Sequence, residues 1–320
     1  MKRTVLYLLT LLIAGCSNFL DEENQDLIIP RTVDHYKALL HREAFIQNIQ
    51  NIYTDLMTDD IEENDAAITK DKNLYKSMYT WQRDIELDGD NQPSDVNNTW
   101  TKLYKLILYA NYVEENIEKA EGSESEKRAI LGEAHFIKGK SYLELVNLYA
   151  SHYVPGNADK QIGVPIRKGT GVEETYGRSS VAKVYKIVVE ELKAAIADFK
   201  ASGVKNSLWH PNEAAACLLL SRAYLYMYDY EASAEMASEA IRLSGGRLWN
   251  LNDQKGVFVN TINPEILHTY GDNSSLCIAS SIVVYDPTPL IYSGSNTQTY
   301  RPSKGLMNSF LEGDLRREQY

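Results

Sequence analysis

Apolar residues recur every three to four positions in six segments of this chain, a spacing that places them on one face of an α-helix. The segments with this pattern are 32–52, 100–119, 126–150, 181–199, 212–228 and 231–243. In the longest of them, Ile130, Ala134 and Ile137 share one face. The pattern predicts a mainly α fold whose helices bury these faces against one another.

Polar and small residues mark where the predicted helices begin and end. Ser123 and Glu126 have the spacing of a capping box. Pro211 lies where proline often opens a helix. The other residues suited to helix ends are Ser179 or Ser180 at a start, and Gly245 and Gly246 at an end.

The segments 212–228 and 231–243 are separated by two residues and predict a helical hairpin. Its small and aromatic residues fall near positions that a tetratricopeptide repeat fills with such residues: Ser221, Tyr224, Tyr228, Tyr230, Ser233 and Ala240. Hairpins that cannot bury their faces alone must stack on neighbours, and 100–150 is predicted as an earlier, weaker repeat. The predicted fold is therefore mainly α, with tetratricopeptide-like hairpins, long ligand-binding loops and a few short strands.

Two regions lack the helical period. Residues 57–98 are rich in Asp, Asn and Lys and are predicted to be long loops with short helical pieces. After residue 250, segments 257–259 and 281–285 are predicted strands among Asn, Asp, Gly and Pro. Long loops within a compact domain are usually functional or disordered.

The N-terminus has the layout of a secretory signal. Lys2 and Arg3 precede the apolar run Val5–Leu12, which is too short to span a bilayer, and small residues then lead to Cys16. A cysteine at the cleavage point resembles a bacterial lipoprotein signal. We therefore predict a signal peptide over 1–15 and a tether over 16–31 that is lipidated at Cys16. An ordinary signal peptide with a chance cysteine, or an uncleaved anchor, is the alternative.

Net charge, cysteine content and tyrosine content each bear on the structure or function of the chain. The net charge of −11 makes the chain a poor candidate for binding nucleic acid. Cys217 and Cys277 are predicted to be buried free thiols, since cysteine packs as a small hydrophobe, although an exported chain could pair them. The 22 tyrosines, against 6 phenylalanines, suit either a binding surface or tightly packed helices.

Catalytic patterns are not found in the sequence. The six histidines lack metal-ligand spacing, and there is no Gly-x-Ser-x-Gly elbow, P-loop or dinucleotide fingerprint. Acidic loops could supply carboxylates, but such loops are usually only solvated. We predict that the protein is not an enzyme and that it has no cofactor and no resident metal. Binding of Ca²⁺ stays open, because acidic loops could hold this ion, although no EF-hand spacing is present.

A glycan-binding surface needs exposed aromatic rings that stack on sugars and polar groups that bond their hydroxyls. The candidate ligand-binding residues are Trp81, Tyr79, Tyr75, Asp60, Arg83, Asn98 and Tyr292, with Tyr285 and Tyr300 as further late-loop rings. Trp81 is the first choice, because an aromatic residue between polar residues in a loop is often exposed. Trp81 could instead have a structural role and pack against the edge of the helical scaffold. Trp100, Trp209 and Trp249 are predicted to be structural.

Seven short segments follow one another along the chain: Cys16–Asp21, Trp100–Asn111, Glu133–Tyr149, Gly163–Pro165, Gly177–Tyr185, Asn263–Leu267 and Asp314–Arg316. In this order they resemble the SusD/RagB-type outer-membrane nutrient-binding lipoproteins of Bacteroidetes. The resemblance implies a lipid-anchored, cell-surface protein that binds a glycan and delivers it to a SusC-like TonB-dependent transporter. A peptide-binding member of the family, or a scaffold lipoprotein that holds a partner protein, stays open.

The resemblance also implies the domain organisation. Residues 32–250 would form the SusD-like helical domain, and 251–320 the loop-rich start of the C-terminal region. Family members continue well past the segment that Asp314–Arg316 resembles, so the C-terminal region is expected to be incomplete.

Overall fold

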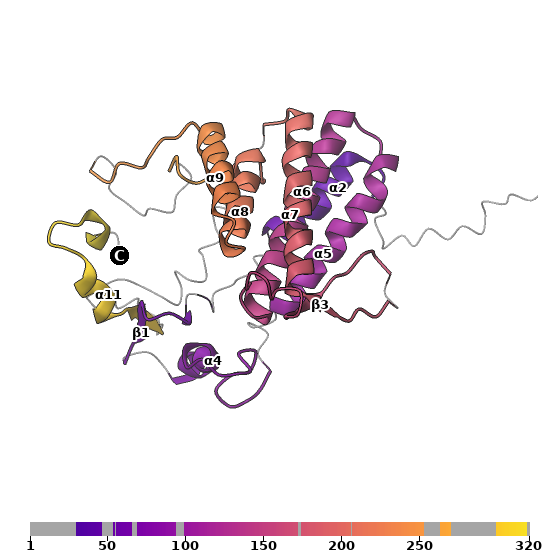
Figure 1. The fold of residues 1–320 in the computed structure, drawn as a ribbon. Coiled ribbons are helices and arrows are strands. Elements are labelled where there is room, and N and C mark those ends of the chain that lie inside the picture. Colours follow the sequence, from indigo (N-terminus) through magenta and orange to yellow (C-terminus); the bar gives the residue numbers. More distant parts are fainter. Residues whose placement is uncertain are drawn as a thin grey trace, which may run out of the picture.

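The computed structural model describes residues 30–46, 54, 56–65, 69–93, 99–171, 174–205, 207–252, 263–269 and 299–318. Over these ranges the protein is mainly α-helical with a few short strands, which confirms the predicted fold class (Figure 1). None of the helices in the described ranges is long and apolar enough to cross a membrane.

The described helices are short in the first and last parts of the chain and longer in the middle, and the described strands are short throughout. The α-helices are α2 (Val33–Leu40), α4 (Thr69–Tyr79), α5 (Thr99–Asn116), α6 (Glu124–Tyr149), α7 (Val181–Ser202), α8 (Glu213–Tyr226), α9 (Tyr230–Ser244) and α11 (Lys304–Ser309). A π-helical turn continues α2, and 3₁₀ turns follow α5 and α11; they are His41–Ile46, Ile117–Lys119 and Leu315–Glu318. The strands are β1 (Ile61–Glu63), β2 (Ile162–Pro165), β3 (Arg178–Ser180) and β4 (Tyr300–Pro302). β1 pairs with β4 and β2 with β3, both antiparallel.

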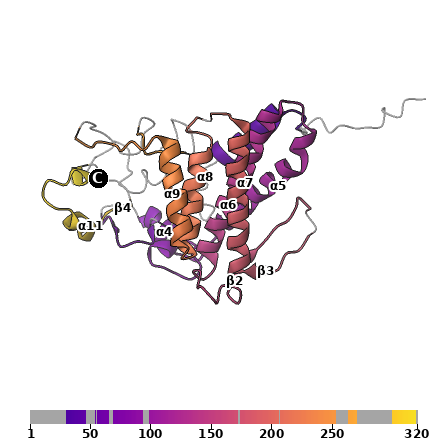
Figure 2. The ribbon, with the colours of Figure 1, turned by 45° about the horizontal axis from the view of Figure 1, so that its top comes forward.

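Helices α5, α6 and α7 lie side by side, and the α8–α9 hairpin packs next to α7 (Figures 1 and 2). The main hydrophobic core fills the space between α5, α6, α7 and α8, where Tyr142, Leu145 and Leu192 are fully buried. A second cluster lies between α2, α5 and α6. Each long helix buries the stripe that its sequence period predicts.

Two glycines set the distance between α6 and α7. A Cβ on Gly132 would lie 2.7 Å from Cδ1 of Phe199, and one on Gly139 would lie 2.9 Å from Cγ of Leu192. Real Cβ atoms essentially never approach heavy atoms closer than 3.0 Å. The absence of side chains at these positions is therefore what allows the two longest helices to pack closely.

Most helix ends follow the predictions. Ser123 and Glu126 form the predicted capping box before α6, and Ser180 rather than Ser179 caps α7. The prediction that Pro211 opens the next helix was wrong. α8 begins at Glu213, because the Asn212 side chain accepts a hydrogen bond from the Ala215 N–H (3.0 Å) and makes Asn212 the cap.

Small residues hold α8 and α9 together, as predicted for the hairpin. The Ser221 hydroxyl donates to the Ser233 carbonyl oxygen (2.8 Å), and the Ser233 hydroxyl donates to the Ser221 carbonyl oxygen (2.9 Å). Cys217 in α8 is a buried free thiol, and burial raises its pKa to about 11. Cys277, the other cysteine that was predicted to be a buried free thiol, lies outside the described residues.

The region predicted as long loops has more regular structure than expected. It contains α4 and β1, and a third small core forms from Leu56, Tyr75, Met78 and Tyr300. α4 is mostly polar, and its apolar side is covered by Tyr300 of β4, which lies far along the chain. A long-range partner of this kind leaves no local sequence signal. The strands predicted at 257–259 and 281–285 lie outside the described residues.

Candidate functional site

Trp81 occupies an unusual position in the turn that ends α4. The Gln82 N–H donates to the Ser77 carbonyl oxygen (2.8 Å), and the Trp81 N–H donates to the Met78 carbonyl oxygen (3.0 Å). These two bonds define a Schellman turn, in which the residue at the position of Trp81 is usually glycine. Trp81 has a φ of 55°, in the left-handed region that glycine adopts most easily.

The side chain of Trp81 is 65% exposed. A left-handed backbone conformation costs an L-residue about 1–2 kcal/mol. Burial of the indole does not offset this cost, because most of the ring faces water. Strained residues concentrate at ligand-binding sites, so Trp81 is the first candidate for ligand contact.

Hydrogen bonds fix the loop that follows Trp81 onto α4. One carboxylate oxygen of Asp88 accepts from the N–H groups of Asp90 (2.8 Å) and Gln92 (2.9 Å). The Asn73 side chain of α4 donates to the Asp90 carboxylate (2.7 Å), and the Asn73 carbonyl oxygen accepts from the Gly89 N–H (2.8 Å). A loop held in this way presents its side chains with little further loss of freedom on binding.

The tyrosines predicted to line the same surface have a different role. Tyr75 and Tyr300 are buried in the small core, with ring centroids 6.5 Å apart. Tyr79 is half-buried 5.0 Å from the Tyr300 ring, and its hydroxyl accepts from the Glu63 N–H (3.2 Å). The expectation that Tyr75 and Tyr300 offer exposed rings is corrected, because they hold β1 and β4 against α4.

Of the remaining predicted site residues, some lie in the described part of the chain and the others lie outside it. Asp60 and Arg83 are exposed. Asp60 adjoins β1, and its carbonyl oxygen accepts from the Ser303 N–H (2.8 Å), which ties this loop to the segment after β4. The others, Asn98, Tyr292, Tyr285 and Cys16, lie outside the described residues.

The charged side chains of Glu62 and Arg301 strengthen the β1–β4 pair. The Arg301 Nε lies 2.7 Å from a Glu62 carboxylate oxygen. The hydrogen bond from the Lys304 N–H, together with the Arg301 guanidinium, holds the pKa of Glu62 below its usual value. This pairing joins the early and late parts of the chain beside the Trp81 loop.

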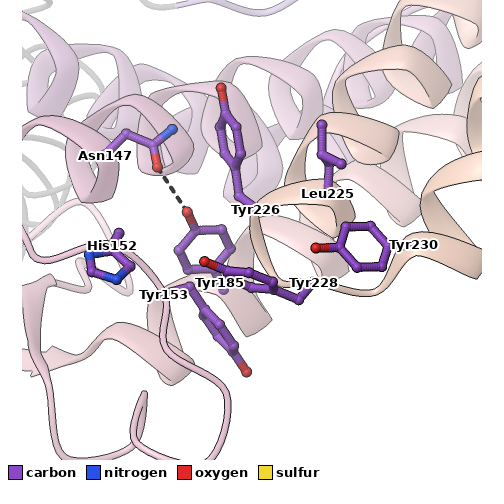
Figure 3. A pocket seen from close by; sticks show the side chains of 8 residues that line it. All are labelled: Asn147, His152, Tyr153, Tyr185, Leu225, Tyr226, Tyr228 and Tyr230. Carbon is purple, nitrogen blue, oxygen red and sulfur yellow. Dashed lines mark hydrogen bonds between the residues drawn. The ribbon is translucent and has the colours of Figure 1, made fainter.

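A cavity that sequence reasoning did not find lies beside the turn between α8 and α9 (Figure 3). Its volume is about 400 Å³. The aromatic residues that line it are Tyr153, Tyr185, Tyr226, Tyr228 and Tyr230. The sequence offered one signal, a tyrosine at residue 228 in the short turn between two helices, where glycine is the common residue.

A buried ion cluster joins α5, α6 and α7. The Lys138 ammonium lies 2.7 Å from Glu114 and 2.9 Å from Glu191, and His135 donates to Glu191 (2.7 Å). Burial and the neighbouring Glu191 raise the pKa of Glu114. Burial alone would raise the pKa of Glu191, but His135 and Lys138 outweigh it and lower that pKa.

The same cluster brings together groups that could ligate a metal. Ligand atoms of Glu114, His135 and Glu191 lie within 4.8 Å of one another, a grouping that the histidine spacing in the sequence did not indicate. The Lys138 ammonium already contacts both carboxylates and supplies the positive charge between them. We therefore interpret the cluster as a structural salt bridge.

The described residues form a helical scaffold with the aromatic rings of Trp81, Tyr228 and Tyr230 exposed at helix ends. A family model described as "Starch-binding associating with outer membrane" matches residues 18–225, which is more than half of the chain. The chain therefore belongs to the SusD-like family, and the resemblance predicted from its sequence segments is confirmed.

Known relatives agree with this assignment. SusD-like protein P25 of Formosa agariphila is 24% identical over 265 residues, which cover 79% of this chain and 48% of the relative. A SusD superfamily protein from Bacteroides thetaiotaomicron has a TM-score of 0.68 at 21% identity and covers 87% of this chain and 61% of its own. A SusD-like carbohydrate binding protein from Bacteroides vulgatus has a TM-score of 0.60 at 20% identity, with 73% and 50% covered. The chain thus spans about half the length of such relatives.

Proposed function

We propose that this protein is a lipid-anchored, cell-surface glycan-binding protein that captures an oligosaccharide or polysaccharide and delivers it to a SusC-like TonB-dependent transporter. Membership of a family described as starch-binding and associated with the outer membrane supports the ligand class and the location. Capture by shape and stacking requires no covalent chemistry.

The observation that carries this proposal is the exposed indole of Trp81, held in a glycine-type turn on a fixed loop. An indole face is flat and apolar, and it matches the C–H face of a pyranose ring. The exposed side chains of Gln82, Arg83 and Asp84 follow it and can hydrogen bond to the hydroxyls at the edge of the same sugar. A turn and loop that are ordered in advance bind without the entropy cost of ordering them.

Replacing Trp81 with glycine is expected to weaken binding of the cognate polysaccharide about tenfold or more, which corresponds to about 1.4 kcal/mol or more. The same change should keep or raise the thermal midpoint, because glycine adopts the positive φ without strain. Titration calorimetry of the purified protein against a panel of polysaccharides, with a melting curve for each variant, measures both effects.

Asn91→Gly provides the matched control. Asn91 is exposed, has a φ of 60° and lies in the same loop, but it carries no ring. Its replacement should leave affinity unchanged. Equal affinity of Trp81→Gly and the unaltered protein for every glycan that binds would exclude Trp81 as the contact.

The lipid anchor is a separate part of the proposal and depends on Cys16. Replacing Cys16 with alanine is expected to remove the acylated residue and move the protein from the membrane to the soluble fraction. Incorporation of radiolabelled palmitate, followed by fractionation and surface proteolysis of whole cells, measures this. Retention of both the label and surface exposure in the variant would contradict lipidation at Cys16.

Delivery to a transporter is tested in the membrane-anchored protein. Co-purification of a TonB-dependent transporter in mild detergent, with glycan uptake lost when the gene for this protein is deleted, is the expected result. Full uptake without the protein would contradict a role in delivery.

A further inference from the structure

We propose that the tyrosine-lined cavity beside the α8–α9 turn is a second binding site, which takes one or two units of an uncharged saccharide. The cavity shares no residue with the Trp81 surface. The choice of a saccharide as ligand rests on the proposed function. The existence of the site and its preference for an uncharged ligand rest on the geometry.

Residues from four helices and two of the segments that connect them line the cavity. Tyr226 ends α8, Tyr228 lies in the turn and Tyr230 begins α9, while Tyr153 and Tyr185 come from the loop after α6 and from α7 (Figure 3). Its volume of about 400 Å³ falls within the usual range for small-molecule sites, about 300–1,000 Å³. The site is therefore large enough for a sugar ring with its hydroxyls.

Tyr228 repeats the arrangement found at Trp81. The Asp229 N–H donates to the Tyr224 carbonyl oxygen (3.0 Å). The Tyr228 N–H donates to the Leu225 carbonyl oxygen (3.1 Å). These bonds form a second Schellman turn, and Tyr228 takes its left-handed position with a φ of 65°. By contrast, α7 and α9 end with glycine in this conformation, at Gly203 and Gly245.

The tyrosine at this position is not explained by packing. Tyr228 is 51% exposed and Tyr230 is 61% exposed, with ring centroids 6.2 Å apart in an edge-to-face arrangement. A bulky residue in a left-handed turn is unusual, and strain of this kind is kept where a function requires it. The Tyr228 ring lines the cavity, and contact of this ring with a ligand would explain why a residue other than glycine is kept in the strained turn.

The back wall of the cavity is rigid. Tyr185 is buried, and its hydroxyl donates to the Asn147 side-chain oxygen (2.8 Å), as Figure 3 shows. The Tyr153 ring meets the Tyr185 ring edge-to-face, with centroids 5.2 Å apart. Burial raises the pKa of Tyr185, so its hydroxyl keeps its proton. One fixed wall and three exposed rings make a site that is largely formed before a ligand arrives.

The polar groups of the cavity suit a ligand with hydroxyl groups and no charge. None of the described residues that line it is Lys, Arg, Asp or Glu. The polar groups are tyrosine hydroxyls, the Asn147 amide and the His152 imidazole. A phenol hydroxyl both donates and accepts, which matches a sugar hydroxyl that does the same. An acidic or sulfated sugar would lack a cationic partner in this part of the structure.

Tyr226, Tyr228 and Tyr230 follow the last residue matched by the family model, residue 225. Three of the eight residues that line the cavity therefore lie beyond the segment that the family model describes.

The test titrates the purified full-length protein with maltohexaose, cellohexaose and xylohexaose, with hexagalacturonate as a charged comparison and decaproline as a peptide comparison. Saturation-transfer NMR and calorimetry measure binding for the unaltered protein, Tyr228→Gly, Tyr228→Phe and the control Asn91→Gly. Tyr228→Gly removes the ring and relieves the strained backbone, so a melting midpoint at or above that of the unaltered protein shows that it is folded.

The expected result is that at least one uncharged hexasaccharide binds about tenfold more weakly to Tyr228→Gly, while Tyr228→Phe, which keeps the ring, loses less. Asn91→Gly should bind normally. The proposal is overturned if no uncharged saccharide loses affinity in Tyr228→Gly, or if only decaproline or hexagalacturonate does.

The same titrations with Trp81→Gly separate this site from the proposed function. Binding that depends on Tyr228 but not on Trp81 supports the cavity and removes the Trp81 surface as the capture site. Binding that depends on Trp81 but not on Tyr228 supports the Trp81 surface and removes the cavity as a binding site. Binding of no saccharide to a folded protein overturns both.

Discussion

Replacing Lys138 with methionine is expected to lower the free energy of unfolding by about 3 kcal/mol at pH 7, within the range observed when one partner of a buried ion pair is removed. The Lys138 ammonium contacts Glu114 and Glu191, and all three side chains are mostly buried. Methionine fills nearly the same volume but leaves the two carboxylates facing each other without the ammonium. Chemical denaturation of the variant and the unaltered protein measures the difference.

The pH dependence of this loss identifies its electrostatic origin. Without the ammonium, the pKa of Glu114, already raised in the folded protein, should rise further. A carboxyl group with a raised folded pKa stabilises the folded state below its unfolded pKa and loses this contribution as the pH rises through the folded value. The deficit of Lys138→Met should therefore be largest above pH 7 and shrink toward pH 5.

A double variant serves as the control. Glu114→Gln combined with Lys138→Met removes a buried charge together with its partner and should recover much of the lost stability, because a neutral replacement of a buried ion pair is often tolerated. Identical unfolding curves for Lys138→Met and the unaltered protein at pH 7 would contradict the interpretation of the cluster as structural.

Replacing Gly132 with valine is expected to destabilise the protein by about 3 kcal/mol, at the upper end of the usual range for overpacking. A Cβ at residue 132 would lie 2.7 Å from the Phe199 ring, and valine adds two methyl groups beyond it. Phe199 is buried, so it can move only by disturbing the core between α6 and α7. Thermal and denaturant unfolding measure the loss.

Combining Gly132→Val with Phe199→Leu tests the cause of this loss. The smaller leucine leaves room for the new methyl groups, so the double variant should be more stable than Gly132→Val alone. If Phe199→Leu brings no recovery, contact with this ring does not set the distance between the helices.

The sequence predicts the long helices well because their signals are local. The apolar stripe of α6 and the capping box of Ser123 and Glu126 lie within the helix or directly beside its first turn. The exposure of Trp81 was also predictable, since polar residues surround it in the chain. These features depend on neighbours in sequence, where period and residue type are informative.

Features that depend on distant neighbours were not predictable. Tyr75 was expected on the surface, but it is covered in part by Tyr300, whose position is set by the pairing of β1 with β4. The tyrosine cavity was missed for a similar reason. Tyr228 was predicted to lie near an aromatic position of a helical repeat, and only the folded chain brings Tyr153 and Tyr185 beside it.

The two Schellman turns have a consequence for how this chain can evolve. With the ligand contacts proposed for Trp81 and Tyr228, heat tolerance and ligand affinity would select for different residues at these positions, because glycine relaxes the backbone and only an aromatic ring can stack on the ligand. Lineages that lose access to the nutrient would be free to drift toward glycine at both codons. Directed evolution for thermal resistance alone would favour the same two changes and would remove the Trp81 and Tyr228 rings, with the ligand contacts proposed for them.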